Sequence, residues 1–331
     1  MKASIYDVAR YCGLSVVTVS RVLNNTGNVR EKNRRKVLDA IEALDYRPHA
    51  AAQSLARGHT RIIGLIMTAL HDRFFETVVN EINRTLARYG YFLALSVSND
   101  VRSRESHDLM HEDRVDGLIL LSLPEEDRYV AQLKKRSIPF VLIDNQRRDH
   151  MVPSVLTDNY YGGYEAAKHL LSLGHTSIAH VCGPEYFLST RERKRGFLDA
   201  LREARLSPFA VVQGDYEIGF GYETAKSWIR SGKLPTAVFA GDDYIAVGIV
   251  NALAEEGMRV PEAMSVIGYD DQYIASRLRP YLTTVRQPAE SIGQSSVELL
   301  LKWIGAGSTA SVTVEWKPEL VIRESTAELK A

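Results

Sequence analysis

The chain has 331 residues, which is long enough for roughly two or three domains. Hydrophobic residues make up 45% and charged residues 25%, a globular composition that excludes a disordered or fibrous chain. The net charge is zero, but residues 1–60 hold ten Lys and Arg against five Asp and Glu, and the remainder holds thirty-one against thirty-six. A basic head on an acidic body favours a polyanion-binding module attached to something that should not touch DNA.

The two cysteines, Cys12 and Cys182, both lie in apolar stretches. This pattern argues against a disulfide framework and fits a reducing compartment. The N-terminus lacks an apolar signal-peptide core, and no stretch has the roughly eighteen apolar residues of a membrane span. We therefore expect a cytoplasmic protein with no membrane partner.

Two short helices open the chain. Residues 4–12 predict the first, with Ser4 and Asp7 as a capping-box pair. Residues 15–23 predict the second, with Ser15 as its N-cap. Gly13 permits the tight turn between them, and Val19 is expected to plug their interface. Two helices joined in this way make a helix-turn-helix, although the pattern alone also fits a helical hairpin that only packs.

A third helix is expected from about residue 31 to 45, where apolar residues recur at helical spacing. Residues 48–57 then predict a helix of about ten residues, which is too short to be stable alone in water. Such a segment becomes helical only when another element packs on it, which suits a linker whose folding depends on the state of the protein. Its one large apolar residue, Leu55, resembles a wedge for a minor-groove step but also fits a hydrophobic staple to the next domain.

From Arg61 onward, strands and helices alternate, so the fold class is α/β with parallel sheets. Strands are expected at 62–67, 91–95, 117–121 and 140–144, with helices at 74–89, about 105–112 and about 127–136. After residues 155–158 a second series follows, with strands near 178–181, 210–213, 237–240 and 265–269 and helices near 163–173, 190–204, 218–230 and 243–256. A helix at 291–304 and a strand at 320–323 close the chain.

Polar residues collect just after several of these strands, namely Ser122, Asp144, Asp158, Asp242 and Asp270. Ligands of open parallel sheets bind outside the carboxyl ends of the strands. Two such lobes facing each other would form a cleft that closes on a small polar molecule by a hinge.

Motifs for other chemistry are missing. His107 and His111 lie four apart on an expected helix, but no third ligand is near them, so we expect no metal site. No dinucleotide fingerprint, P-loop or nucleophile elbow occurs, so we expect no cofactor, no catalytic residues and no enzyme. Asp242 and Asp243 are adjacent and point in different directions, so they do not form a catalytic pair.

With these pieces in place, the sequence closely resembles the lac-repressor family of bacterial transcription regulators (LacI/GalR type). The resemblance covers nearly the whole chain. It rests on motifs at both ends of the head and throughout the body: Asp7-Val8-Ala9, residues 15–24, Tyr46-Arg47-Pro48, Ser54-Leu55, Asp158-Asn159 with Gly162-Gly163, Gly174-His175, Arg193 with Gly196-Phe197, residues 268–271 and residues 283–288.

The resemblance implies an all-α helix-turn-helix head at 1–47, a hinge helix and linker at 48–60, and a two-lobed core at 61–331 that is similar to periplasmic binding proteins. The N-lobe would comprise about 61–159 and 288–316, and the C-lobe about 160–287 and 317–331. It further implies a homodimer whose heads each read half of a near-palindromic operator. The expected DNA-contacting residues are Ser15, Val16, Val17, Thr18, Arg21, Asn24 and Leu55.

By the same resemblance, a small-molecule effector binds between the lobes and contacts Phe74, Phe75, Asp144, Arg193, Tyr216, Asp242, Asp270 and Gln287. Carboxylate, guanidinium, amide and aromatic groups together favour a carbohydrate. A purine-type or other ligand is the alternative, as is a solute-binding protein with a helical appendage. Asp270 with Arg193 also fits a structural ion pair, and Phe74 with Phe75 also fits the core.

The chain departs from the family pattern in three places. Asp72-Arg73 stands where many members have Asn-Pro, which puts the loop beside the expected cleft in doubt. Asp242 stands where Asn is frequent, so its direct contact with an effector is less secure. Arg30 replaces the usual Ser cap of the third helix, which concerns local stability.

Overall fold

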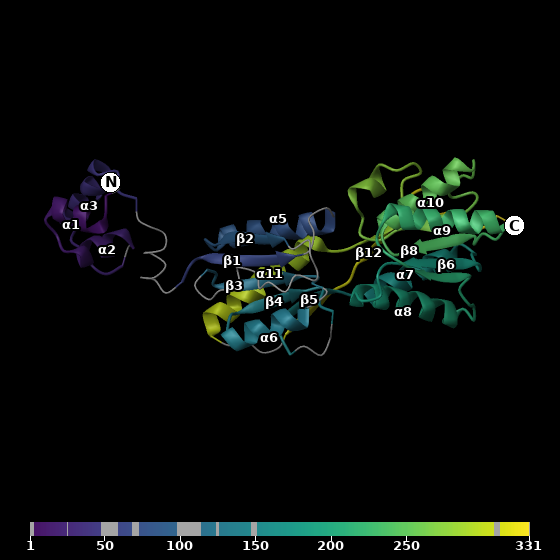
Figure 1. Cartoon of the computed structure of the whole chain (residues 1–331), viewed down its shortest axis with the longest axis horizontal. Coiled ribbons are helices and arrows are strands. Elements are labelled where there is room, and N and C mark those ends of the chain that lie inside the picture. Colours follow the sequence, from purple (N-terminus) through teal and green to yellow (C-terminus); the bar gives the residue numbers. More distant parts are fainter. Residues whose placement is uncertain are drawn as a thin grey trace. The chain divides into compact units, whose positions relative to one another are not determined.

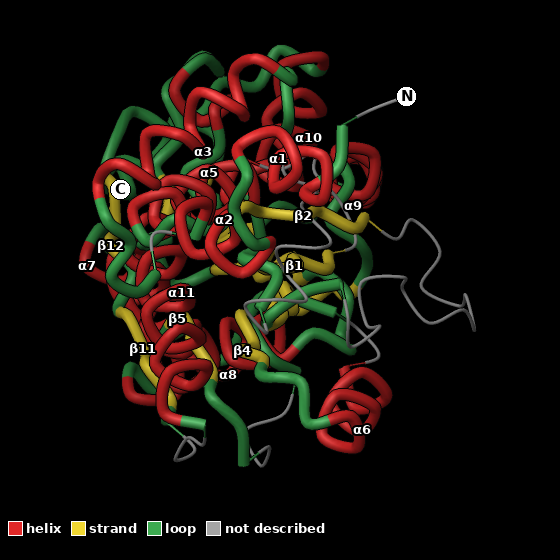
Figure 2. The backbone as a smooth tube through the Cα atoms, turned by 90° about the vertical axis from the view of Figure 1, so that its left-hand side faces the viewer, coloured by secondary structure: helices red, strands yellow, loops and turns green. Residues whose placement is uncertain are grey.

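The computed structural model describes residues 3–24, 26–47, 59–67, 73–97, 114–123, 126–146, 151–307 and 312–330. The chain divides into two compact units, residues 1–60 and 61–331. The described strands all lie in the second unit, and the first is built from helices (Figure 1; Figure 2).

The first unit, called the head, contains three helices: α1 (Ile5–Cys12), α2 (Val16–Leu23) and α3 (Glu31–Ala43). The expected capping box at α1 is present, because the Ser4 side chain accepts from the Asp7 backbone and the Asp7 carboxylate accepts from the Ser4 N–H. At α2, the Ser15 hydroxyl accepts from the Thr18 N–H at 3.2 Å, which confirms the expected N-cap. Each bond satisfies a donor that a helix start leaves unpaired.

The turn between α1 and α2 requires Gly13. Its φ of +66° is left-handed, a conformation that is costly for residues with a Cβ atom. The turn lets the helices bury Val8, Ala9, Val19 and Val22 together with residues of α3 in one small core. Val19 has no exposed surface, as expected for the plug between the helices.

The second unit contains two lobes, each built on a parallel sheet (Figure 1). The first lobe has a six-stranded sheet in the order β11-β5-β4-β3-β1-β2. Its elements are β1 (Ile62–Met67), α5 (Arg73–Arg88), β2 (Phe92–Val97), β3 (Gly117–Leu121), α6 (Glu126–Arg136), β4 (Phe140–Ile143), β5 (Ser154–Thr157), α11 (Ala289–Ala306) and β11 (Thr313–Trp316).

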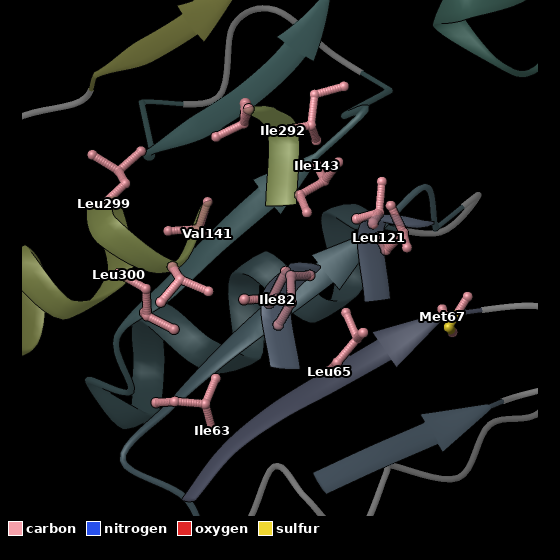
Figure 3. Packing of buried hydrophobic residues seen from close by; sticks show 14 of the residues in the cluster. Ile63, Leu65, Met67, Ile82, Leu121, Val141, Ile143, Ile292, Leu299 and Leu300 are labelled. Atoms are coloured by element: carbon pink, nitrogen blue, oxygen red, sulfur yellow. The ribbon is translucent and has the colours of Figure 1, made fainter. Parts of the chain in front are cut away.

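Alternation along these strands feeds two separate cores. Ile63, Leu65 and Met67 of β1 point to one face, where α5 and α11 cover them (Figure 3). Ile66 lies with the side chains that point to the opposite face, where α6 covers the sheet. The central strands of a parallel sheet are covered on both sides, so they are apolar at nearly every position. This pattern predicts such strands from the sequence.

The second lobe has a four-stranded parallel sheet in the order β7-β6-β8-β9. One face is covered by α7 and α8, and the other by α9 and α10. The elements are α7 (Asn159–Ser172), β6 (Ile178–Cys182), α8 (Leu188–Glu203), β7 (Ala210–Gln213), α9 (Ile218–Ser231), β8 (Ala237–Ala240), α10 (Asp243–Glu255), β9 (Ser265–Ile267), the 3-10 helix η2 (Tyr273–Ser276) and the antiparallel pair β10 (Thr284–Arg286) and β12 (Glu319–Val321).

The described chain passes between the lobes after β5, after β10 and after β11. The sequence reading did not assign these three strands, which have only three or four residues each. The expected strand at 265–269 was also too long, because it ends at Ile267 and the chain then turns at Gly268 and Asp270. Short strands carry too little periodicity to be recognised without their neighbours.

Several expectations fall outside the described residues: the hinge helix with Leu55, Asp72, and the helix carrying His107 and His111. Among the described helices, none is both long and apolar enough to cross a membrane. Both cysteines are free, as expected.

The start of α3 offers a test of the capping analysis. Arg30 occupies the N-cap position with extended backbone and provides no side-chain hydrogen bond to the helix. We expect Arg30→Ser to stabilise the head by about 1 kcal/mol, because a Ser hydroxyl satisfies one of the unpaired N–H groups. Amide hydrogen exchange of α3 in the full chain measures this gain, and Arg30→Ala is the control that should show none. Equal protection in both variants would contradict the prediction.

Candidate functional site

A cavity of about 470 Å³ lies in the second unit, and both lobes contribute to its lining. All eight side chains expected at an effector site line it. Six residues that the sequence reading did not select also line it: Ser122, Phe187, Ser189, Glu217, Ile218 and Tyr244. The size is within the usual range for small-molecule sites.

Arg193 of α8 organises the wall formed by the second lobe. Its side chain is almost completely buried, and its guanidinium donates to the Asn159 side chain at 2.9 Å and to the Gly241 carbonyl at 2.7 Å. It also lies 3.4 Å from Asp270 and 3.6 Å above the Tyr269 ring. Burial acts to lower the pKa of Arg193, but Asp270 together with Tyr216, Tyr269 and Asp144 more than offsets this and the pKa is raised. The side chain therefore stays charged.

Close helix packing holds Arg193 in place. A Cβ atom at Gly163 of α7 would collide with the Arg193 carbonyl, and one at Gly196 of α8 would collide with the Tyr160 carbonyl. The two glycines therefore allow α7 and α8 to approach backbone to backbone at the arginine. This gives a physical reason for Gly163 and Gly196, while a Cβ atom at Gly162 would instead collide with the Tyr269 side chain.

Asp270 and Gln287 connect the two lobes at the cavity. The Gln287 amide donates to Asp270 at 2.7 Å, and its carbonyl accepts from the Thr157 hydroxyl at the end of β5 at 2.7 Å. Asp270 has a φ of +97°, so its backbone is in the region that disfavours most side chains. The Gln287 side chain is thereby fixed between a strand of the first lobe and a carboxylate of the second.

Asp144 is the carboxylate that the first lobe places in the cavity. Ser122 donates to it at 2.9 Å, across the ends of the neighbouring strands β3 and β4. Burial raises the pKa of Asp144, and the charge of Arg193 together with bonds from Ser122 and Ser189 opposes that rise. The pKa of this carboxyl group therefore depends on the charge of any molecule that enters the cavity.

Aromatic rings reach the cavity from both lobes. Phe74 and Phe75 of α5 have ring centroids 5.5 Å apart, and Phe74 is also part of the first lobe's core. On the other side, the Tyr216 hydroxyl bonds to Thr190 at 2.6 Å and its ring lies 6.3 Å from Phe187. Burial raises the pKa of Tyr216, so its hydroxyl remains protonated. Rings on two sides suit a flat or ring-shaped ligand.

The adjacent acids Asp242 and Asp243 have different roles. Asp242 lines the cavity and caps α10 by accepting from the Ile245 N–H at 2.8 Å. Asp243 is fully buried and accepts from the Thr284 hydroxyl and the Gln272 N–H, both at 2.6 Å. Burial raises the pKa of Asp243, and its place is structural. The two side chains have different hydrogen-bond partners, in keeping with adjacent residues that point in different directions.

For three of the six additional lining residues, the sequence contains a pattern that could have indicated the site. Ser122 follows strand β3, and it was noted as polar but not assigned to the site. Glu217 and Ile218 directly follow Tyr216 and begin α9. Phe187, Ser189 and Tyr244 carry no such signal, because their side chains line the cavity only as a result of where α8 and α10 begin in the fold.

In the head, α2 presents the expected DNA-contacting residues unequally. Val17 and Arg21 lie four residues apart, and both side chains are exposed. Val16 differs, since it is half-buried and packs against the head core. Ser15 and Thr18 share the cap of α2, with their hydroxyls 2.9 Å apart, and Asn24 donates to the Ser20 hydroxyl at 3.2 Å.

Sequence comparisons assign both parts of the chain. Residues 4–49 match the family described as bacterial regulatory proteins, lacI family, and residues 167–326 match the periplasmic binding protein-like domain. The HTH-type transcriptional repressor PurR of Edwardsiella ictaluri is 36% identical, over 98% of this chain and 97% of its own. Catabolite control protein A of Priestia megaterium is 34% identical, over 98% and 100%.

Solved structures agree. The lac repressor dimer bound to operator and the anti-inducer ONPF has a TM-score of 0.88 and 30% identity, covering 99% of this chain and 100% of that one. The complex of the transcriptional regulator CelR with cellobiose has a TM-score of 0.74 and 28% identity, over 98% and 100%. A LacI family regulator from Enterococcus faecium with bound ribose has a TM-score of 0.74 and 31% identity, over 81% and 100%.

These relatives are regulators and not enzymes, and PurR, catabolite control protein A and the lac repressor match this chain in both its head and its core. The chain therefore belongs to the lacI family of bacterial regulatory proteins, as a transcriptional repressor with a helix-turn-helix DNA-binding domain and an effector-binding core.

Proposed function

We propose that this repressor acts as a cytoplasmic homodimer that binds a near-palindromic operator, and that a sugar or sugar derivative in the cavity controls its operator affinity. The observation that carries the proposal is the cavity, which has contributions from both lobes and contains carboxylate, amide and aromatic groups. Val17 and Arg21 are the side chains proposed to reach base edges. Arg can bond guanine in bidentate fashion, and Val can contact a thymine methyl group.

The sugar assignment has two supports. Carboxylate and amide groups bond to hydroxyls, and aromatic rings pack on the apolar face of a sugar. In addition, two structurally similar regulators hold cellobiose and ribose. A nucleobase would use the same rings, so it remains the alternative ligand.

The coupling would operate through closure of the lobes. Several contacts already join them. Gln287 links Thr157 to Asp270, and the Gln146 side chain accepts from the Leu188 N–H at 2.9 Å. A ligand that binds both walls favours one arrangement of the lobes. In a dimer, such a shift changes the spacing at which the two hinge segments, residues 48–57, can fold together on DNA.

A thermal-shift screen tests the effector class. A ligand present at 100 times its dissociation constant stabilises the protein by about 2.7 kcal/mol, which raises the melting temperature visibly. We expect a hit among mono- and disaccharides. A hit confined to nucleobases would overturn the sugar assignment and leave DNA binding untouched.

Asp270 provides the second test. Asp270→Asn removes the charge but keeps a residue that tolerates positive φ, whereas Asp270→Ala adds backbone strain. We expect Asp270→Asn to weaken effector binding by about tenfold to a hundredfold, since bonds to a charged group contribute about 1.5–3 kcal/mol. Calorimetry with the screened ligand measures this loss, and operator affinity without ligand should not change. Unaltered effector affinity would remove Asp270 from the site.

Leu55 tests the hinge. We expect Leu55→Ala to weaken operator binding while leaving effector affinity within about twofold, because an apolar wedge acts only on DNA. Fluorescence anisotropy with a labelled operator and calorimetry with the effector give the two numbers. Equal losses in both would contradict the minor-groove role.

A further inference from the structure

The charges around the cavity are strongly unequal. Among the described lining residues there are four carboxylates and one guanidinium; the acids are Asp144, Glu217, Asp242 and Asp270, and the cation is Arg193. A neighbouring cavity of about 110 Å³ repeats the pattern, with Asp270, Asp271 and Glu290 against Arg286. A ligand would therefore enter a predominantly acidic environment.

The single cation is already engaged by the protein. Arg193 donates to Asn159 and to the Gly241 carbonyl, and it faces Asp270. Its flat face lies against Tyr269. An anionic ligand would have to compete with these partners for the guanidinium.

Helix starts could reverse this balance, because a helix N-terminus carries about half a positive charge and commonly binds anions. Three helices of the second lobe begin at the cavity, and their N-cap residues Phe187, Glu217 and Asp242 all line it. Two of these caps are themselves carboxylates. The first N–H of α8, from Leu188, already donates to Gln146 of the other lobe.

We infer that the cavity selects against negatively charged ligands and takes an uncharged or amine-bearing sugar, and that phosphorylated sugars are excluded. The inference rests on the proposed function for the sugar scaffold alone. The charge selection follows from the lining, in which four acidic side chains face one arginine that already has protein partners. Bringing a phosphate to this position costs desolvation, and no described lining residue offers a free cation to replace the water.

The potential can be measured without knowing the ligand. Ile218 lines the cavity and is 41% exposed, so Ile218→Cys places a reactive thiol there. The native thiols do not interfere when Cys12→Ser is the background, because Cys182 is fully buried and burial raises its pKa to about 12. A cationic and an anionic methanethiosulfonate each modify this cysteine at a measured rate. Each rate is divided by the rate at which the same reagent reacts with 2-mercaptoethanol in solution.

Ile322→Cys is the matched control, since Ile322 is an exposed isoleucine of the same unit, lies outside the cavity lining and is followed in the chain by Arg323 and Glu324. We expect the cation-to-anion ratio at position 218 to exceed that at position 322 by about tenfold. Asp242→Asn keeps the helix cap but removes a charge, so it should bring the ratio closer to the control. Equal ratios at both positions, or a faster anionic reagent at position 218, would overturn the inference.

A ligand panel separates this inference from the proposed function. Neutral sugars, their 2-amino-2-deoxy forms and their 6-phosphates are compared by thermal shift. Stabilisation by the first two groups but not by the third supports the inference. Equal stabilisation by a phosphorylated sugar overturns it while leaving the sugar effector standing. A cation-preferring cavity that binds no sugar of any kind contradicts the proposed effector and leaves the charge inference intact.

Discussion

The buried guanidinium of Arg193 is the interaction on which the effector core depends. A charge removed from water is tolerated only when it is paired and hydrogen-bonded, and this one is held by α7 through Asn159, by the end of β8 through Gly241 and by Asp270 beyond β9. Removing Asp270 would leave a buried charge uncompensated, and losing either neutral acceptor would leave a buried N–H group unpaired. The arginine thus fixes three elements of the second lobe relative to one another, and Gln287 extends that network into the first lobe.

The same network explains how a ligand could be sensed. Asp270 and Gln287 line the cavity and also join the lobes, so a bound molecule acts on groups that already bridge them. Gln146 forms a second bridge, in which a side chain of the first lobe satisfies the Leu188 N–H at the start of α8. At Asp270 and Gln287, the proposed ligand contact and the connection between the lobes involve the same side chains, which is what a conformational switch needs.

The sequence predicted the elements that are specified by a few neighbouring residues. Caps at Ser4 and Ser15, the turn at Gly13 and the buried strand at 62–67 each carry a local signal, and the structure has them. Of the eight residues assigned to the cavity, Asp144, Asp242 and Asp270 were also indicated by their positions just after strands, whereas the other five came from family resemblance. Phe187 and Tyr244 were missed because their place depends on how helices begin around a cleft, and short strands such as β11 were missed because their register depends on distant neighbours.

If a small molecule in the core is coupled to DNA binding by the head, effector affinity and operator affinity must depend on each other reciprocally. Effector affinity is measured by calorimetry with and without saturating operator, and operator affinity by anisotropy with and without effector. We expect the effector affinity and the operator affinity to change by the same factor, in the range of about 5 to 150. An effector affinity that is identical with and without operator would show that the cavity and the head are not coupled.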